Sequence, residues 1–348
     1  MKYHFASDNT AGITPEAWTA LKSANAGYEP GYGEDAWTAR ASDLIRDVFE
    51  TDCEVFFTFN GTAANSLSLA AMCQSYHSII CHEMSHVETD ECGAPEFFSN
   101  GTKVLVAGGD DGKINVAEAE RVALRRTDVH FPKTKVISIT QPTEVGTVYS
   151  LDELEAIGET ARRLSLKVHM DGARFANALV SLNTTPKEIT WQRGIDVLCL
   201  GGTKQGMPVG DAVVFFNKDL AHEFEYRCKQ SGQLASKMRF LTAPWVGMLE
   251  NDVWLKHARH ANECAQNLAA GLRKFPDIEF YTPVQANGVF IRLPGPVHEY
   301  LKQAGWRYHS FIADGISRLM CSWNTTHEDI EDFLGDVSAG YGSQSSAR

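Results

Sequence analysis

The sequence predicts an α/β fold in which a large domain with a mostly parallel, helix-covered sheet precedes a smaller C-terminal α+β domain. Short apolar runs alternate with amphipathic helical patterns from about residue 41 to residue 216, and this alternation is typical of a parallel sheet with helices on its faces. Near Pro244 the alternation stops, and a long helical pattern continues to about Lys274. The length of 348 residues also favours more than one domain.

Taken in order, the chain divides into four parts. An N-terminal arm is predicted over residues 1–40, because their apolar residues show little helical or strand periodicity outside one short helix. The large domain is predicted over 41–245, the small domain over 246–339 and a Gly/Ser-rich disordered tail over 340–348. Strands are expected at 55–59, 78–81, 103–106, 135–140, 166–170, 197–200, 212–216, 288–293 and 316–322. Helices are expected at 15–24, 43–49, 62–75, 116–126, 151–164, 254–274, 297–304 and 326–337.

The composition limits the classes of partner. A formal net charge of -12 argues against nucleic acid and against an anionic membrane surface. The N-terminus has no apolar signal region, and no run reaches the roughly 20 apolar residues that a membrane helix needs. The eight cysteines form no C-x-x-C pair, which favours reduced, mostly buried thiols over a zinc ribbon or a disulfide framework. We therefore expect a cytoplasmic protein.

One lysine lies in a glycine-rich loop between two apolar runs. The stretch 198–210 reads Leu-Cys-Leu-Gly-Gly-Thr-Lys-Gln-Gly-Met-Pro-Val-Gly, with Lys204 at its centre. Glycines let the backbone approach a bound group closely, and a desolvated lysine amine is neutral and nucleophilic near neutral pH. These are the properties of a lysine that forms a Schiff base. An ordinary loop with a solvated lysine fits the same stretch.

Two further sites follow predicted strands. Asp171 ends the run 166–170, and a buried acid there needs a cationic partner. A protonated pyridine nitrogen would serve, as would Arg174 in a simple ion pair. After the strand 55–59, Gly61 and Thr62 open a helix whose N-terminus predicts an anion site; the same residues also fit an ordinary helix cap.

Read together, these motifs resemble a known family. The anion site, His-Met-Asp-Gly-Ala-Arg at 169–174 and Gly-Gly-Thr-Lys-Gln-Gly at 201–206 are similar to the threonine aldolase family, which belongs to the aspartate-aminotransferase-type fold (fold type I) of pyridoxal-phosphate enzymes. The resemblance covers nearly the whole chain. It also includes Ser7-Asp8-Asn9-Thr10, Gly31-Tyr32-Gly33-Glu34-Asp35, His86 and Arg318.

The resemblance implies a pyridoxal 5'-phosphate site. Lys204 would form the Schiff base with the cofactor, and Asp171 would pair with the pyridine nitrogen. Gly61 and Thr62 would bind the phosphate, helped by Arg239, which in the family reaches the cofactor of a neighbouring subunit. The implied assembly is a homotetramer, a dimer of dimers that share active sites.

The resemblance also implies the substrate contacts. His86 would stack on the cofactor ring and is expected among the catalytic residues, while Arg174 would lie beside the cofactor. Ser7, Arg174 and Arg318 would bind the substrate carboxylate, for which a guanidinium offers a bidentate fork. Thr143 is expected to contact the substrate as well.

The implied reaction is retro-aldol cleavage of the Cα–Cβ bond of a β-hydroxy-α-amino acid. L-Threonine and L-allo-threonine would give glycine and acetaldehyde, and phenylserine is a further expected substrate. A β-eliminating lyase or an aminotransferase remains the alternative, because the same cofactor frame serves all three activities.

One departure from the family concerns the group that acts on the substrate hydroxyl. Many members carry a histidine in an Asn-Thr-His-Asn segment, whereas this chain has Gln141-Pro142-Thr143-Glu144. The base is then His86, His82, Glu144 or a bound water, and we favour His86.

A rival motif overlaps these histidines. The segment His82-Glu83-Met84-Ser85-His86 fits the zinc-protease pattern H-E-x-x-H. That interpretation needs a helix that presents both histidines on one face. The apolar run 78–81 ends directly before His82, and no apolar stripe follows, so a strand that passes into a loop fits better. We expect no metal here.

Overall fold

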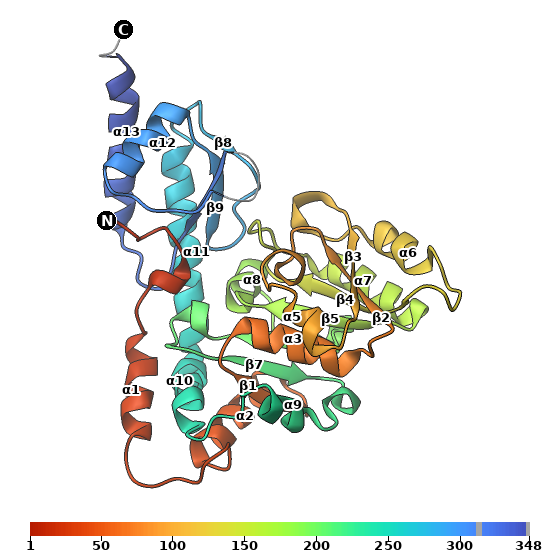
Figure 1. Cartoon of the computed structure of the whole chain (residues 1–348). Coiled ribbons are helices and arrows are strands. Elements are labelled where there is room, and N and C mark those ends of the chain that lie inside the picture. The colour runs from red at the N-terminus through yellow and green to blue at the C-terminus, as the bar shows by residue number, and fades with distance from the viewer. Residues whose placement is uncertain (311–314, 346–348) are drawn as a thin grey trace.

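The structure is a computed structural model that describes residues 1–310 and 315–345. Within these residues the large domain holds a seven-stranded sheet in the order β1-β7-β6-β5-β4-β2-β3. The small domain holds a three-stranded antiparallel sheet in the order β10-β9-β8 (Figure 1). The predicted α/β architecture is confirmed.

The strands are short, and the helices lie between them along the chain. The strands are β1 (Glu54–Thr58), β2 (His77–His82), β3 (Lys103–Ala107), β4 (Lys133–Thr140), β5 (Lys167–Gly172), β6 (Val197–Gly201), β7 (Asp211–Phe215), β8 (Glu279–Phe280), β9 (Gly288–Arg292) and β10 (Ile316–Met320). The α-helices are α1 (Pro15–Ala24), α2 (Ala36–Phe49), α3 (Gly61–Met72), α4 (His86–Thr89), α5 (Ala94–Phe98), α6 (Val116–Leu124), α7 (Leu151–Leu164), α8 (Phe175–Leu182), α9 (Phe224–Gln230), α10 (Arg239–Leu249), α11 (Val253–Leu272), α12 (Gly295–Gln303) and α13 (His327–Ser345).

Strand direction determines where the chemistry lies. Strands β3, β2, β4, β5 and β6 are parallel to one another, whereas β7 is antiparallel to both β6 and β1. Strand β1 therefore runs in the direction of β6. The carboxyl ends of β1, β5 and β6 consequently meet at one edge of the sheet, together with the beginning of β7. Ligands of open α/β sheets bind at this edge.

Helices cover both faces of the large sheet. Leu67 of α3 and Phe224 of α9 belong to the core on one face. Ile45 of α2, Leu154 of α7 and Trp245 of α10 belong to the core on the opposite face. Fully burying one such side chain contributes about 1.5–3 kcal/mol, so both helical layers stabilise the sheet.

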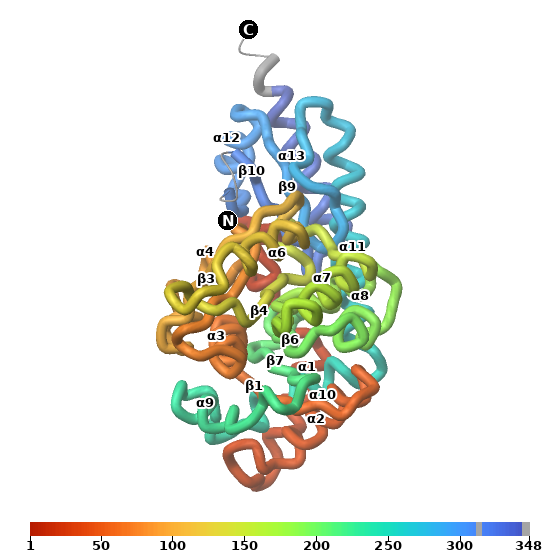
Figure 2. Tube along the Cα trace, turned by 90° about the vertical axis from the view of Figure 1, so that its right-hand side faces the viewer, coloured from red at the N-terminus to blue at the C-terminus, as the bar shows by residue number. Residues whose placement is uncertain are grey.

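The start of the N-terminal arm packs on the small domain. Phe5 is fully buried there, with its ring centroid 5.3 Å from that of Phe333 and 5.8 Å from that of Trp306. The Phe5 carbonyl also accepts a hydrogen bond from Met320 N at 3.0 Å. The chain then descends past the large sheet to α1, which packs on α10, and the long α11 rises from α10 into the small domain (Figures 1 and 2). The arm thus links the domains.

Some boundaries differ from the sequence prediction. Helix α2 begins at Ala36 rather than at residue 43, because Asp35 caps it by accepting the Thr38 N–H at 2.8 Å. Helix α13 reaches Ser345, past residue 340 where a disordered tail was expected, and residues 346–348 of that tail lie outside the described residues. In the described part of the chain, no helix has the length and apolar character needed to cross a membrane. All eight cysteine thiols are free, and Cys92 is the exposed one.

Candidate active site

Lys204 lies at the edge of the sheet where the strand ends meet. It occupies a short 3-10 turn, Thr203–Gln205, directly after β6. Asp211, the first residue of β7, holds this turn in place. Its Oδ1 accepts the Gly202 N–H at 2.8 Å and the Thr203 N–H at 3.4 Å. Burial raises the pKa of Asp211 against the effect of these bonds. A Cβ on Gly201 would lie 2.4 Å from the Ala173 carbonyl oxygen, so this glycine permits the close approach of β6 to β5.

Asp171 projects from the end of β5 at the same edge. Its side chain is buried, with Oδ1 bonded to Ala173 N and Oδ2 bonded to Asn65 Nδ2, both at 2.9 Å. The alternative partner, Arg174, is bonded elsewhere, to Asp8. Asp171 is therefore a buried acid held by neutral donors, and this arrangement leaves its negative charge for a cationic group.

The predicted anion site lies at the N-terminus of α3. Asn60 caps the helix by accepting the Ala63 N–H at 2.9 Å, and Gly61 and Thr62 form the first turn, whose N–H groups have no acceptor within a helix. Arg239 begins α10, and its buried Nη1 meets no hydrogen-bond acceptor in residues 1–310 and 315–345. A free helix N-terminus suits a phosphate group, and the guanidinium of Arg239 is a second donor group that suits one.

His86 is held by a buried carboxylate. It begins α4, and its Nδ1 lies 2.8 Å from Glu91 Oε1, while its Nε2 lies 3.6 Å from Asp90 Oδ2. The hydrogen bond to Glu91 raises the pKa of His86. Burial raises the pKa of Glu91, although His86 and Asn65 oppose that effect by donating to it. The imidazole is therefore fixed in one orientation.

The rest of the H-E-x-x-H segment does not form one helix. His82 ends β2, whereas His86 begins α4. The His82 ring is bound on both sides by backbone, because Nδ1 accepts the Met84 N–H at 3.0 Å and Nε2 lies 3.1 Å from the Gly109 carbonyl oxygen. The zinc-protease interpretation lacks the helix on which it depends, and His82 has no ring nitrogen left for a substrate.

Arg174 forms an ion pair with Asp8 near the N-terminus. Its Nε lies 2.6 Å from Asp8 Oδ2 and its Nη2 lies 3.0 Å from Asp8 Oδ1. Burial opposes the charges, but the pair outweighs it, so the pKa of Asp8 is lowered and that of Arg174 is raised. Asn287 Nδ2 also donates to Asp8 at 3.2 Å. Ser7 caps the same turn by accepting the Asn9 N–H.

Two cavities adjoin at Asn287. One is lined by both predicted carboxylate-binding arginines, Arg174 and Arg318, and by Glu144. The other is lined by Lys204. Burial lowers the pKa of Arg318, and the charge of Arg174 lowers it further. Asp8 offsets the charge of Arg174, and both guanidinium groups line the cavity.

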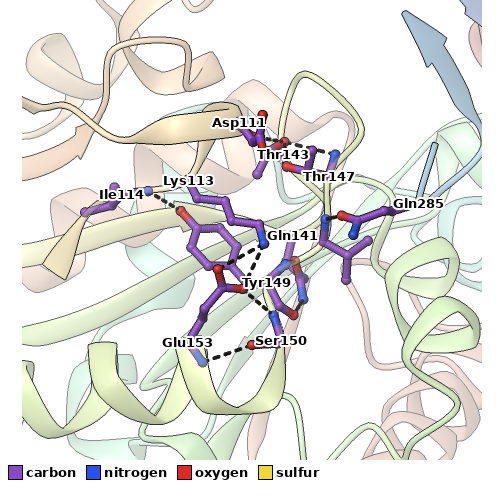
Figure 3. Close-up of polar contacts among 11 residues, drawn as sticks. Asp111, Lys113, Ile114, Gln141, Thr143, Thr147, Tyr149, Ser150, Glu153 and Gln285 are labelled. Carbon is purple, nitrogen blue, oxygen red and sulfur yellow. Dashed lines mark hydrogen bonds and ion pairs between the residues drawn. The ribbon is translucent and has the colours of Figure 1, made fainter. Parts of the chain in front are cut away.

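The loop that carries Glu144 is held by a polar network (Figure 3). Thr143 Oγ1 lies 2.7 Å from Thr147 Oγ1, which donates to the Asp111 carbonyl at 2.6 Å. Gln141 pairs with Tyr149 through its side chain, accepting the Tyr149 N–H at 2.9 Å and donating to the Tyr149 carbonyl at 3.0 Å. Thr143, which was expected to contact the substrate, lines the arginine cavity, but its hydroxyl is bonded within this network.

Most predicted residues are therefore brought to one edge of the sheet. Sequence reasoning missed the groups that hold them, namely Asp8, Asn65, Glu91 and Asp211. Asp8 lies inside the Ser-Asp-Asn-Thr segment, so the sequence contained a motif that marks it. Asn65 lies in a helix and Glu91 in a loop, and neither stands in a motif that indicates its role.

The chain is similar to known proteins over nearly its whole length. Residues 4–294 match the family model described as beta-eliminating lyase. The chain is 59% identical over 335 residues to a "Low specificity L-threonine aldolase" of a Pseudomonas species, covering 96% of this chain and 97% of that protein. A protein of the same name from Pseudomonas aeruginosa is also 59% identical over 333 residues, 96% of each chain.

Solved structures show the same fold. A threonine aldolase structure from Leishmania major superposes with a TM-score of 0.91 at 28% identity, covering 97% of this chain and 99% of that one. Aspartate aminotransferase from Thermus thermophilus superposes with a TM-score of 0.71 at 16% identity, covering 95% and 89% of the two chains, and supports the fold alone.

Proposed function

Because the chain belongs to the beta-eliminating lyase family and, within it, to the low-specificity L-threonine aldolases, we propose that its site cleaves β-hydroxy-α-amino acids to glycine and an aldehyde. The enzyme is a pyridoxal-phosphate-dependent lyase. The observation that carries the site assignment is the meeting of Lys204, Asp171 and the α3 N-terminus beside a cavity with two arginines.

The residues fit the cofactor. Lys204 would attach it, and Asp171 would face its pyridine nitrogen, with Asn65 keeping the carboxylate in place. Gly61 and Thr62 would bind the phosphate through their N–H groups. When bound, pyridoxal phosphate supplies an electron sink for the pair left on Cα when the Cα–Cβ bond breaks.

The arginine cavity selects which bond breaks. Arg318, with Arg174 and Ser7 beside it, would hold the substrate carboxylate. A carboxylate held in place fixes the rotation about the Cα–N bond. In the fixed orientation the Cα–Cβ bond would stand perpendicular to the cofactor ring, where its cleavage is easiest. An aminotransferase needs the Cα–H bond in that position instead. His86 would cover the cofactor ring, and the bond between its Nδ1 and Glu91 would hold the imidazole in that position.

We assign the removal of the hydroxyl proton to Glu144. It lines the arginine cavity, whereas His82 is bound on both ring nitrogens. His86 is less suited to this role, because its Nδ1 lies 2.8 Å from Glu91 Oε1 and its Nε2 lies 3.6 Å from Asp90 Oδ2. This assignment replaces His86, which the sequence favoured.

Glu144→Gln tests that role. We expect kcat for L-threonine cleavage to fall about 10²–10³-fold, while exchange of the glycine α-proton with deuterated solvent stays unchanged, because that exchange involves no hydroxyl. Glu159→Gln, an exposed substitution on α7, is the control. Equal losses in both reactions, or no loss in either, would contradict the assignment.

The activity itself is tested by product analysis. Purified holoenzyme given L-threonine, L-allo-threonine or phenylserine should release glycine and the matching aldehyde in equal amounts. A β-eliminating lyase would give a keto acid and ammonia, and an aminotransferase would need a keto acid as co-substrate. If none of the three substrates yields glycine, the aldolase assignment is wrong.

We further propose a cytoplasmic homotetramer whose dimers share active sites. Support comes from the free cysteine thiols and from Arg239, whose buried Nη1 meets no hydrogen-bond acceptor in the described residues. Mixed oligomers of Lys204→Ala and Arg239→Ala subunits should recover activity if Arg239 serves the neighbouring subunit. Failure to recover activity in mixed oligomers would contradict the sharing.

A further inference from the structure

A continuous hydrogen-bonded chain joins Asp171 to His86. Asn65 Nδ2 donates to Asp171 Oδ2 at 2.9 Å and to Glu91 Oε1 at 2.8 Å. The same Glu91 oxygen lies 2.8 Å from His86 Nδ1. The four residues come from α3, β5, α4 and the segment after α4, so the fold assembles this chain from distant parts of the sequence.

Burial of this hydrogen-bonded chain costs free energy of folding, so stability alone does not explain its presence. Asn65, Glu91 and Asp171 are 2%, 3% and 4% exposed. Two carboxylates share one amide nitrogen, and because both neighbours are acceptors, the amide must present its nitrogen to them. Asn65 Oδ1 and Glu91 Oε2 remain without hydrogen-bond partners in the part of the chain that the structure describes. Replacing buried ionic groups by apolar residues of similar volume is often neutral or stabilising in proteins.

We propose that Asn65 and Glu91 form a positioning relay that fixes the His86 ring and couples it to Asp171. The role rests on the proposed function, in which Asp171 meets the nitrogen of the cofactor ring and His86 covers its face. The relay then links the two residues that contact the ring from different sides. Neither Asn65 nor Glu91 needs to touch the substrate.

The relay fixes both the orientation and the charge of the imidazole. Glu91 accepts from Nδ1, so the ring cannot rotate freely and Nε2 points away from Glu91. The carboxylates that act on His86 are Glu91, Asp90, Asp171 and Glu144. Of these, Glu91 makes the short Nδ1 contact, whereas Asp90 lies 3.6 Å from Nε2 and its side chain is exposed. Removing the Glu91 charge should therefore release the His86 proton at lower pH.

Glu91→Gln tests the relay with a readout that does not need activity. Holoenzyme with ¹⁵N-labelled histidine rings is titrated by NMR, and the His86 signals are identified by their loss in His86→Gln. We expect the His86 midpoint to move to lower pH in Glu91→Gln and the dissociation constant for pyridoxal phosphate to rise about tenfold. Glu88→Gln, on an exposed residue of α4, should leave both unchanged.

Glu91→Asp separates charge from shape. The shorter carboxylate keeps the charge, so we expect it to restore the His86 titration toward that of the wild type, and it also serves if Glu91→Gln fails to fold. An unchanged His86 midpoint in Glu91→Gln would overturn the relay. A His86 midpoint in Glu91→Asp as low as that in Glu91→Gln would overturn it as well. Because the titration needs no substrate, loss of the aldolase assignment alone would not alter this result.

Discussion

Replacing Lys204 with alanine is expected to reduce kcat for glycine release from L-threonine by about 10³-fold or more. The reason is positional, since Lys204 is the amine that the turn after β6 holds at the meeting point of the strand ends. Among the described residues that line its cavity, no other lysine takes its place. Steady-state rates with saturating pyridoxal phosphate measure the loss.

The matched control is Lys237→Ala. Lys237 is exposed and lies just before α10, so its removal should change kcat less than about twofold. Circular dichroism of both variants shows whether the fold is kept. If Lys204→Ala retains a tenth or so of the wild-type kcat, Lys204 is not the cofactor lysine.

Replacing Asp171 with asparagine is expected to reduce kcat about 10²–10⁴-fold. The substitution keeps the size of the side chain but removes the negative charge at the end of β5. Without that charge the pyridine nitrogen is not held protonated, and the electron pair on Cα is stabilised less. The rate with L-threonine at saturating cofactor gives the size of the effect.

Asp196→Asn is the control for the loss of a partly buried carboxylate. Asp196 precedes β6 at the opposite edge of the sheet, where its Oδ2 accepts the Val168 N–H at 2.9 Å. We expect this variant to lose stability and to keep the wild-type kcat. A similar fall in kcat for both aspartate variants would show that Asp171 acts through the fold rather than through the cofactor.

The sequence predicted the parts of the site that follow a strand. Lys204 and Asp171 each come directly after a short apolar run, and parallel strands bring such positions to one edge. Gly61 and Thr62 were predicted for the same reason, because a helix begins where β1 ends. A local pattern was enough in each case.

The groups that hold these residues could not be predicted in this way. Asp8 and Arg174 are separated by most of the large domain in sequence, and only the fold pairs them. Glu91 lies beyond the H-E-x-x-H segment, where the sequence indicated only a loop. The direction of β7 was also hidden, because an apolar run carries no sign of strand polarity, so the position of Asp211 under the Lys204 turn became visible only in the structure.

The assignment of Lys204 is tested most directly by locating the cofactor on the chain. Sodium borohydride reduces the bond between pyridoxal phosphate and its lysine to a stable link, and proteolysis with mass spectrometry then identifies the modified peptide. We predict that the purified holoenzyme carries the label on Lys204, in the peptide that contains Gly-Gly-Thr-Lys-Gln-Gly. Label on another lysine, with Lys204 unmodified, would contradict the account of the site.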